Sequence, residues 1–342
     1  MTERVKIGIV GAGAIGGVIA TMLAKANYDV EITKPNYGGV VIDNRINIEI
    51  NGVFGNVNYL VPFVEGNAFT TPKDILIVCT KAYSVYDAIN DTKKYLKNDG
   101  VVVCVQNVLS LNDVFRVIPP EKFIPLVIDW SSMRQNQNDI LVFNNGVMHI
   151  GFLNGGNLNQ LKLVKSVLDN VCNTVIEKDV YGFLFGRFLL YCNTSCLGAL
   201  TGYKLGVYLK EKQAKKILLE LISEQLTILQ KMNIKPQPYC NILDYYKFTE
   251  KSLQGIFYRR DMFKRLIEKN GENVSQTLRL IENKHKSEVD YLCNYFSKMA
   301  IKFNVYAPYN NAMTKLLKQI ETGQKSIVLK NLYDEEFLNI KE

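Results

Sequence analysis

Val5-Lys-Ile-Gly-Ile-Val-Gly-Ala-Gly-Ala-Ile-Gly16 is an apolar strand pattern that runs directly into a GxGxxG pattern, and a helical pattern follows from Ala20 to Ala26. This order of strand, glycine turn and helix is typical of a dinucleotide-binding site. The glycines allow a tight turn, a close approach to a diphosphate and close packing of the helix on the strand. A chance glycine-rich turn is the alternative. The predicted cofactor loop consists of Gly11, Ala12, Gly13, Ala14, Ile15 and Gly16.

The second strand is expected at Asp29 to Thr33, and its end predicts which coenzyme is bound. In such folds an acid at this point binds the ribose 2′-hydroxyl of NAD. Here the next residue is Lys34, which can pair with a 2′-phosphate, so NADP is favoured. Glu31 lies inside the strand and limits this preference, and Lys34 as an ordinary loop lysine is the alternative.

Alternating strand and helix patterns continue the first domain to about residue 178. Ile46 to Ile50, Asn51-Gly52 and Val53 to Val64 predict an antiparallel hairpin. Beyond Asp179 only helical periodicity remains. The predicted domains are therefore 1–178, which is α/β, and 179–342, which is all-helical. Further strands are expected at Asp74–Cys79, Gly100–Val105, Phe123–Trp130, Ile140–Phe143, Val147–Gly151 and Thr174–Glu177, and helices at Tyr83–Leu96, Asn157–Asn170, Leu205–Met232, Glu272–Asn304 and Asn311–Thr322.

The composition fits a globular protein with a small anionic ligand. Of 342 residues 47% are hydrophobic, and 41 Lys and Arg against 33 Asp and Glu give a net charge of +8 without a basic run, so we expect no nucleic-acid partner. Seven cysteines without a CxxC pair and only two histidines predict reduced thiols and no metal. The N-terminus lacks a secretory apolar segment, which predicts a cytoplasmic protein. Polar residues interrupt the apolar segment Gly182–Leu200, which favours a buried helix over a membrane span.

Polar side chains follow two successive predicted parallel strands. Lys81 comes after the strand that ends near Cys79, and Gln106-Asn107 follow the next strand. Ligands collect at the carboxyl ends of strands in open α/β sheets. Lys81 and Asn107 are therefore candidate ligand-binding residues, and ordinary polar residues at strand ends are the alternative.

These segments resemble the ketopantoate reductase (2-dehydropantoate 2-reductase) family over nearly the whole chain. The resemblance implies a Rossmann-like NADPH-binding domain followed by a helical domain like the C-terminal domain of 6-phosphogluconate dehydrogenase, with the active cleft between them, and a role in pantothenate biosynthesis. The matching segments are Gly11-Ala-Gly-Ala-Ile-Gly-Gly17, the basic Lys34, Thr80-Lys-Ala-Tyr83, Gln106-Asn107, Asn145-Gly-Val-Met-His-Ile-Gly151, Ser287-Glu-Val-Asp-Tyr291 and Pro308-Tyr-Asn310.

The resemblance also implies roles for single residues. Lys34 and Lys81 match cofactor-binding positions, and Asn107 matches an asparagine between cofactor and substrate. Glu288 matches a glutamate that touches the cofactor near the reacting centre. The alternative for Glu288 is a solvated helical carboxylate paired with Lys284, four residues earlier.

This chain departs from the family at the expected catalytic positions. The family's general-acid lysine is replaced by Arg187, which holds its proton and so can stabilise an alkoxide but is a poor proton donor. Tyr191 and Ser195 stand where the family has substrate-binding asparagines, and Val108 and Leu205 replace a glycine and another asparagine. Gln276 aligns with a substrate-binding serine. Ketopantoate itself is therefore an uncertain substrate, because polar recognition positions have changed.

Arg187, Tyr191 and Ser195 have a spacing of four residues, so one helix would present them on one face. We expect the Arg187 cation to lower the pKa of Tyr191 and make it the proton donor. In the alternative, Tyr191 packs in the core and Arg187 neutralises a buried carboxylate.

The sequence thus predicts an NADPH-dependent reductase that delivers hydride to the carbonyl of a small 2-oxo acid. The catalytic candidates are Arg187 and Tyr191, and the substrate-binding candidates are Asn107, Tyr191, Ser195 and Gln276. Three alternatives stay open: a reductase of a more apolar ketone or imine, an NADPH-binding protein without turnover, and an opine-type dehydrogenase. The sequence does not determine the oligomeric state, and a homodimer is one of the states considered.

Overall fold

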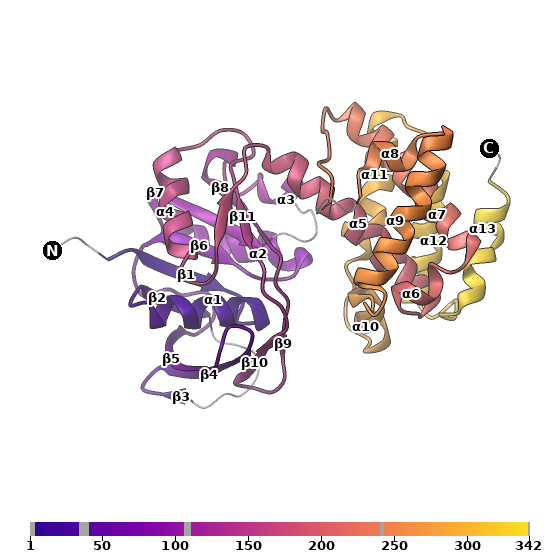
Figure 1. The fold of residues 1–342 in the computed structure, drawn as a ribbon. Coiled ribbons are helices and arrows are strands. Elements are labelled where there is room, and N and C mark those ends of the chain that lie inside the picture. The colour runs from indigo at the N-terminus through magenta and orange to yellow at the C-terminus, as the bar shows by residue number, and fades with distance from the viewer. Residues whose placement is uncertain (1–3, 34–40, 106–110, 240–242, 341–342) are drawn as a thin grey trace. The chain divides into compact units, whose positions relative to one another are not determined.

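The computed structural model describes residues 4–33, 41–105, 111–239 and 243–340, without the side chains of 41, 42, 112 and 113. These residues form two compact units, one ending at Val180 and the other beginning at Tyr181 (Figure 1). The first unit is a sheet with helices, and the second consists of helices. The fold is therefore an α/β Rossmann-like domain followed by an all-helical domain, as the sequence predicts.

The first unit contains one sheet of twelve strands among the described residues. Its order is β12-β11-β8-β7-β6-β1-β2-β5-β4-β10-β9, with β3 paired to β4. The pairs between neighbours from β8 to β5 are parallel, whereas β4 runs antiparallel to β5. The strands are β1 (Lys6–Val10), β2 (Asp29–Thr33), β3 (Val41–Ile42), β4 (Arg45–Gly52), β5 (Val57–Val64), β6 (Lys73–Val78), β7 (Leu96–Val105), β8 (Phe123–Ile128), β9 (Ser132–Arg134), β10 (Asp139–Val142), β11 (Met148–Ile150) and β12 (Thr174–Ile176).

The central parallel strands are apolar because both of their faces are covered. Ile7 and Ile9 in β1 and Ile75 and Ile77 in β6 are almost completely buried. Helix α1 packs against α4, and α2 packs against α3. The helices of this unit are α1 (Ala14–Lys25), α2 (Ala82–Thr92), α3 (Leu111–Val114) and α4 (Leu158–Leu168), with short 3-10 turns η1 (Lys93–Tyr95) and η2 (Pro120–Lys122).

The predicted hairpin is present as β4 and β5, but its connection lies later than Asn51-Gly52. Gly52 still belongs to β4, and β5 begins at Val57. Strand β10 adds to β4 in parallel, and β9 pairs with β10. The sequence analysis did not predict β9, because three residues carry too little periodicity for a strand assignment.

The second unit is helical, but two of its expected long helices are broken. Residues 205–232 form α6 and α7, with a break at 209–211. Residues 272–304 form α10, a 3-10 turn and α11, and Lys284 takes a positive φ of 56° between them. The elements are α5 (Val180–Thr201), α6 (Leu205–Tyr208), α7 (Lys212–Lys231), α8 (Tyr245–Thr249), α9 (Leu253–Asn270), α10 (Gln276–Glu282), η3 (Val289–Tyr291), α11 (Cys293–Phe303), α12 (Pro308–Glu321), η4 (Leu329–Tyr333) and α13 (Glu335–Leu338).

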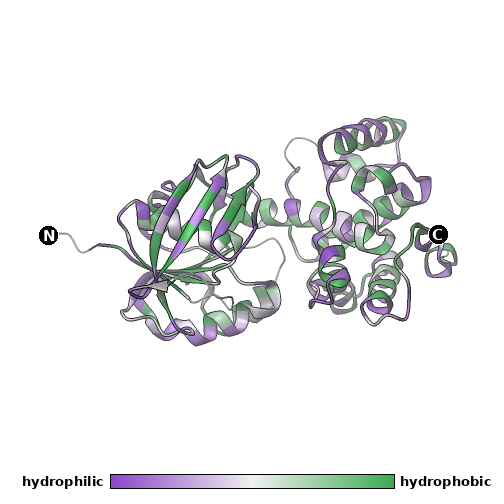
Figure 2. Cartoon of the chain, turned by 90° about the horizontal axis from the view of Figure 1, so that it is seen from below, coloured by the Kyte–Doolittle hydropathy of each residue, from purple (hydrophilic) through white to green (hydrophobic). Residues whose placement is uncertain are grey.

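Helix α5 is the apolar segment that the sequence analysis compared with a membrane span. It is long and apolar enough to cross a membrane, but 78% of its most apolar window is buried inside the structure. Other helices of this unit carry hydrophobic and hydrophilic residues on different sides (Figure 2). The burial of α5 is that of a core helix, as the sequence analysis expects.

Candidate cofactor and substrate sites

The predicted cofactor loop forms the turn between β1 and α1. Gly11 has a φ of +101°, which side chains rarely adopt, and its N–H donates to Thr33 Oγ1 at 3.0 Å, at the end of β2. A Cβ on Gly16 would lie 2.1 Å from the carbonyl oxygen of Gly11. Both glycines are therefore required by the turn itself. Helix α1 begins at Ala14, earlier than the expected Ala20, so the loop leads directly into its N-terminus.

The end of β6 lies against this loop. The N–H of Cys79 donates to the carbonyl of Val10 at 2.8 Å, and a Cβ on Gly11 would lie 3.0 Å from the backbone carbon of Cys79. Lys81 follows two residues later, half-buried, as the residue that precedes α2. The structure thus places Lys81 at the carboxyl end of β6, the same edge of the sheet as the glycine loop.

The geometry of the loop fits a dinucleotide diphosphate. Nothing lies within 4 Å of the position of a Cβ on Gly13, so the space that a side chain would fill is open. The first N–H groups of α1 have no partner within the helix, and a helix N-terminus favours anions. Thr80 Oγ1, on the residue beside Gly11, is buried without a hydrogen-bond partner among the described residues. An open, donor-rich turn of this kind can hold a phosphate group.

Glu31, the residue that limited the NADP preference, is engaged elsewhere. Its carboxylate lies 2.6 Å from the ammonium of Lys73 and accepts from the backbone N–H of Thr70 at 3.1 Å. Burial raises its pKa, but the hydrogen bonds from Lys73 and Thr70 outweigh burial and hold the pKa below its ordinary value. Glu31 is therefore held as an ion pair inside the fold. Two further predicted residues, Lys34 and Asn107, lie outside the described residues.

Arg134, which no sequence motif marks, contacts the glycine loop. From the end of β9 its Nη2 donates to the carbonyl of Ala12 at 2.7 Å and to that of Gly13 at 3.4 Å. More than 120 residues separate Arg134 from the loop in sequence, and no motif surrounds it. Only the position of β9 in the sheet reveals the contact.

In the second unit, Arg187, Tyr191 and Ser195 all belong to α5, which confirms the predicted single helix. The hydroxyl of Tyr191 donates to Gln276 Oε1 at 3.4 Å, and Gln276 is the exposed first residue of α10. Ser195 Oγ lies 2.9 Å from Thr277 Oγ1. The structure therefore brings three predicted substrate residues together, Tyr191, Ser195 and Gln276.

The close approach of α10 to α5 has a local cause. Ser275 caps α10 by accepting from the N–H of Leu278 at 3.0 Å, and its hydroxyl donates to the carbonyl of Ser195 at 2.8 Å. A Cβ on Gly198 would lie 2.6 Å from the Cβ of Ser275. A serine followed by an apolar helical pattern is a sequence signal for such a cap, but its bond to α5 is tertiary.

Glu288 is buried, with 5% of its surface exposed. The alternative interpretation of Glu288 as a solvated carboxylate paired with Lys284 on one helix is therefore wrong. The helix α10 ends at Glu282, and Glu288 precedes the 3-10 turn η3. Glu288 also corrects the expectation for Tyr191. Burial raises the pKa of the Tyr191 phenol well above its ordinary value, and the nearby charge of Glu288 raises it further. Tyr191 is thus a weaker acid than a free phenol, not a stronger one.

Arg187 lies one turn before Tyr191 and is half-buried. Its guanidinium carbon is 5.4 Å from the centroid of the Tyr239 ring, a cation–π distance. Tyr239 belongs to a segment that bonds to α5, because the N–H of Gln237 donates to the carbonyl of Gly182 at 2.8 Å. An aromatic ring therefore lies beside the cation at this end of the α5 face.

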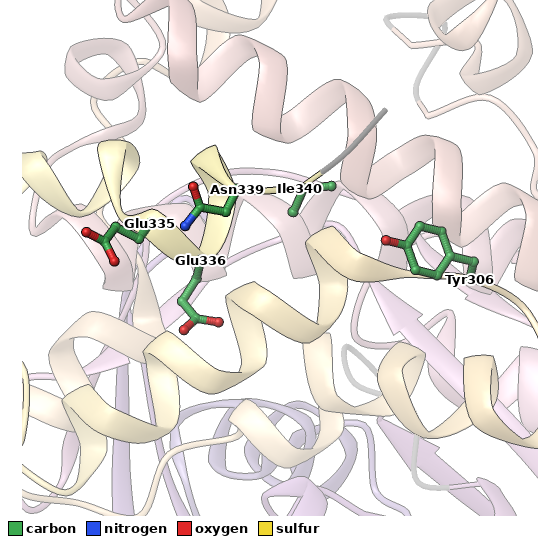
Figure 3. A pocket seen from close by; sticks show the side chains of 5 residues that line it. All are labelled: Tyr306, Glu335, Glu336, Asn339 and Ile340. Carbon is green, nitrogen blue, oxygen red and sulfur yellow. The ribbon is translucent and has the colours of Figure 1, made fainter.

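A separate hollow lies near the end of the chain and has a different character. Figure 3 shows two carboxylates on its wall, and it is lined by Tyr306, Glu335, Glu336, Asn339 and Ile340. Lys315 pairs with Glu336 at 2.6 Å. Acidic walls disfavour an anionic coenzyme or substrate, and this hollow contains none of the predicted site residues. Among the described residues, no cluster of His, Cys, Asp or Glu could hold a metal ion.

Comparisons with known proteins agree with this architecture. The chain is 22% identical over 325 residues to 2-dehydropantoate 2-reductase of Aquifex aeolicus, covering 92% of this chain and 96% of that protein. It resembles the ternary structure of D-mandelate dehydrogenase with NADH and anilino(oxo)acetate, with a TM-score of 0.76, 18% identity, and coverage of 93% of this chain and 99% of that chain. It also resembles the dimeric ketopantoate reductase of Staphylococcus aureus, with a TM-score of 0.70, 14% identity, and coverage of 94% and 100%.

The family assignment rests on both units. Residues 7–155 match the family described as ketopantoate reductase PanE/ApbA, and residues 184–321 match its C-terminal part. The two matches contain the glycine loop and the α5 residues described above. The chain is therefore an oxidoreductase that belongs to the ketopantoate reductase PanE/ApbA family.

Proposed function

We propose that this protein is an NADPH-dependent reductase that delivers hydride to the carbonyl of a small 2-oxo acid such as ketopantoate. The observation that carries the proposal is the row of Arg187, Tyr191 and Ser195 on one face of α5, with Gln276 beside it. The open glycine loop of the other unit supplies the cofactor side. Membership of the reductase family supports this pairing of a dinucleotide loop with a polar helix face.

The coenzyme would be held by the loop from Gly11 to Gly16, with Lys34, Lys81, Asn107 and Glu288 as further binding residues. When bound, NADPH supplies the hydride. Lys34 favours the 2′-phosphate by charge, and the ion pair of Glu31 with Lys73 removes the carboxylate nearest the end of β2 from competition for a 2′-hydroxyl. Both points support NADPH over NADH.

On the substrate side, Arg187 supplies a fixed positive charge that can bind a carboxylate or stabilise a developing alkoxide. Tyr191 stays protonated because its pKa is raised, and its hydroxyl can donate to the alkoxide, which is a stronger base than a phenolate. Without substrate the Tyr191 hydroxyl donates its one hydrogen to Gln276 Oε1, so this hydrogen bond is exchanged for one to the alkoxide when Tyr191 acts as donor. Ser195 and Asn107 provide further polar contacts.

A more apolar 2-oxo acid, ketone or imine is the second candidate substrate. The aromatic ring of Tyr239 lies beside Arg187, so a cation next to apolar surface is available in this unit. D-mandelate dehydrogenase, which has a similar fold, is known with anilino(oxo)acetate, an aromatic ligand. This observation favours testing aromatic 2-oxo acids as substrates in addition to ketopantoate. Reduction of ketopantoate would give the protein a role in pantothenate biosynthesis. We further propose a cytoplasmic homodimer, since a family member is dimeric.

The test begins with separate fluorescence titrations of NADPH and NADH into the full chain. Ketopantoate, an aromatic 2-oxo acid, a simple ketone and an imine are then added while the NADPH absorbance is followed. Loss of absorbance with a 2-oxo acid supports the proposal, and loss only with the ketone or imine moves the substrate to the second candidate. Tight NADPH binding without oxidation by any of them would identify a binding protein, and dependence on an added amino acid would identify an opine-type dehydrogenase. Absence of binding refutes all of these functions.

A further inference from the structure

Arg134 reaches the cofactor loop from the far end of the sheet. It ends β9, which pairs with β10, and β10 pairs with β4 of the hairpin insertion. Its Nη2 donates to Ala12 O at 2.7 Å and to Gly13 O at 3.4 Å, and its Nη1 donates to Gln137 O at 2.5 Å. One planar side chain thus links its own turn to the glycine loop.

The packing around α1 keeps Arg134 in this place. A Cβ on Gly17 would lie 2.5 Å from Ile140 Cδ1 and 3.3 Å from Arg134 Nη2. Ile140 is fully buried in β10, directly opposite Arg134 in the antiparallel pair. The first turn of α1 therefore lies directly against the β9–β10 pair, and Gly17 permits the contact.

The contact orients the peptide between Ala12 and Gly13. In a trans peptide the C=O and the N–H lie on opposite sides. Because Arg134 holds the carbonyl of Ala12 on one side, the N–H of Gly13 is directed to the other. The carbonyl of Gly13 accepts from the N–H of Gly17 at 2.9 Å as well as from Arg134 at 3.4 Å, so the first turn of α1 itself orients the N–H of Ala14. These two donors stand at the N-terminus of α1, where an anion is favoured.

We propose that Arg134 is a positioning residue for the diphosphate bridge of the bound dinucleotide. It holds the carbonyl side of the loop so that the N–H side is preorganised for the phosphates, and its permanent charge adds a positive field behind the loop. Its effect is therefore on every ligand that contains the diphosphate, with or without a 2′-phosphate. This inference rests on the proposed dinucleotide binding and assigns a residue that lies outside the glycine motif.

The test uses the full chain and ligands that contain parts of the coenzyme. Arg134→Gln is titrated with NADPH, NADH, ADP-ribose, which has the diphosphate, and 2′-AMP, which lacks it. We expect Kd to rise by about tenfold for the three diphosphate ligands, because one charge-assisted hydrogen-bond contact is lost. For 2′-AMP we expect Kd to rise by less than about twofold. Arg134→Lys should recover only part, because an ammonium cannot reproduce the planar fork.

Arg45→Gln is the matched control, since Arg45 is an exposed arginine of β4, the strand that pairs with β10, and the change removes the same charge. It should leave all four Kd values unchanged. An equal loss of 2′-AMP and ADP-ribose affinity in Arg134→Gln, or no loss at all, overturns the role of Arg134 while the proposed function stands. Failure of the unsubstituted protein to bind both dinucleotides and ADP-ribose overturns both proposals.

Discussion

The carboxylate of Glu31 in β2 and the ammonium of Lys73 in β6 are 2.6 Å apart and meet across β1, the strand between them. Gly8 of β1 is paired with Glu31 on one side and with Leu76 on the other, and a Cβ on Gly8 would lie 2.9 Å from the Leu76 side chain. Lys73 is completely buried. The ion pair therefore links β2 to β6 across the central strand β1.

Glu31→Gln should destabilise the fold without changing coenzyme preference. The change leaves the buried Lys73 charge without its counter-ion, which costs about 3 kcal/mol of unfolding free energy. The pKa of Glu31 is lowered in the fold, so the stability it contributes is present above the ordinary carboxyl pKa and is lost as pH falls through the lowered value. Thermal unfolding at pH 7 and at pH 3 should thus show a difference that shrinks in acid.

Asp29→Asn is the control for this prediction, because Asp29 is an exposed acid in the same strand. The ratio of the Kd values for NADPH and NADH should be the same in Glu31→Gln and in the unsubstituted protein. A marked gain of NADPH over NADH in the variant would show that Glu31 contacts the ribose, contrary to the ion pair described here.

Gly13→Ala should abolish coenzyme binding while the fold stays intact. Gly13 has a φ of −73°, which alanine adopts freely, and its Cβ would enter open space. If a diphosphate occupies that space, the methyl group blocks it, and Kd for both coenzymes should rise by about a hundredfold or more. Gly16→Ala is the contrasting variant, since its Cβ would overlap the carbonyl of Gly11 and should lower the melting temperature as well. Normal NADPH affinity in a folded Gly13→Ala protein contradicts the loop's assignment.

Tyr191→Phe should lower kcat by about a hundredfold, the usual contribution of a positioned proton donor, with Kd for NADPH unchanged. The raised pKa of Tyr191 predicts a further feature: its ionisation should not reduce the rate of the unsubstituted enzyme between pH 7 and about pH 10, the ordinary phenol value. Tyr181→Phe, on the same helix, should change kcat by less than about twofold. Unchanged turnover in Tyr191→Phe would leave Tyr191 as a packing residue only.

Sequence reasoning was accurate where short-range patterns carry the information. The glycine loop, the central strands and the shared helix of Arg187, Tyr191 and Ser195 all follow from spacing along the chain. It failed where a contact depends on elements that are distant in sequence. Arg134 meets Ala12 only through β9, and Glu288 is buried in a segment that follows the end of α10 at Glu282.

The charge environment of Tyr191 shows the same limit. From the helix alone, Arg187 is the obvious neighbour and should acidify the phenol. In the fold, burial and Glu288, almost a hundred residues later in the chain, act in the opposite direction. A pKa depends on desolvation and on charges from every element around the group, and neither is readable from one helical face.

His149→Gln tests the cluster of His149, Asp129 and Glu177, which lies at the end of the sheet formed by β8, β11 and β12. His149 lies in β11, with Nδ1 2.8 Å from Glu177 Oε1, after β12, and Nε2 3.3 Å from Asp129 Oδ2, after β8. Burial lowers the pKa of His149, but the hydrogen bonds to Asp129 and Glu177 outweigh burial and raise it. A raised histidine pKa gives stability that is complete below the ordinary value of about 6.5 and is lost as pH rises through the raised value.

At pH 6 the free energy of unfolding should therefore be about 1 kcal/mol higher for the unsubstituted protein than for His149→Gln. This corresponds to about 3 °C in the melting temperature of the first unit, and the difference should shrink toward pH 9. His285→Gln is the control, because His285 is exposed in the second unit. A stability difference that stays constant from pH 6 to pH 9 would mean that His149 contributes by packing, and that its two carboxylate partners do not hold it charged in the fold.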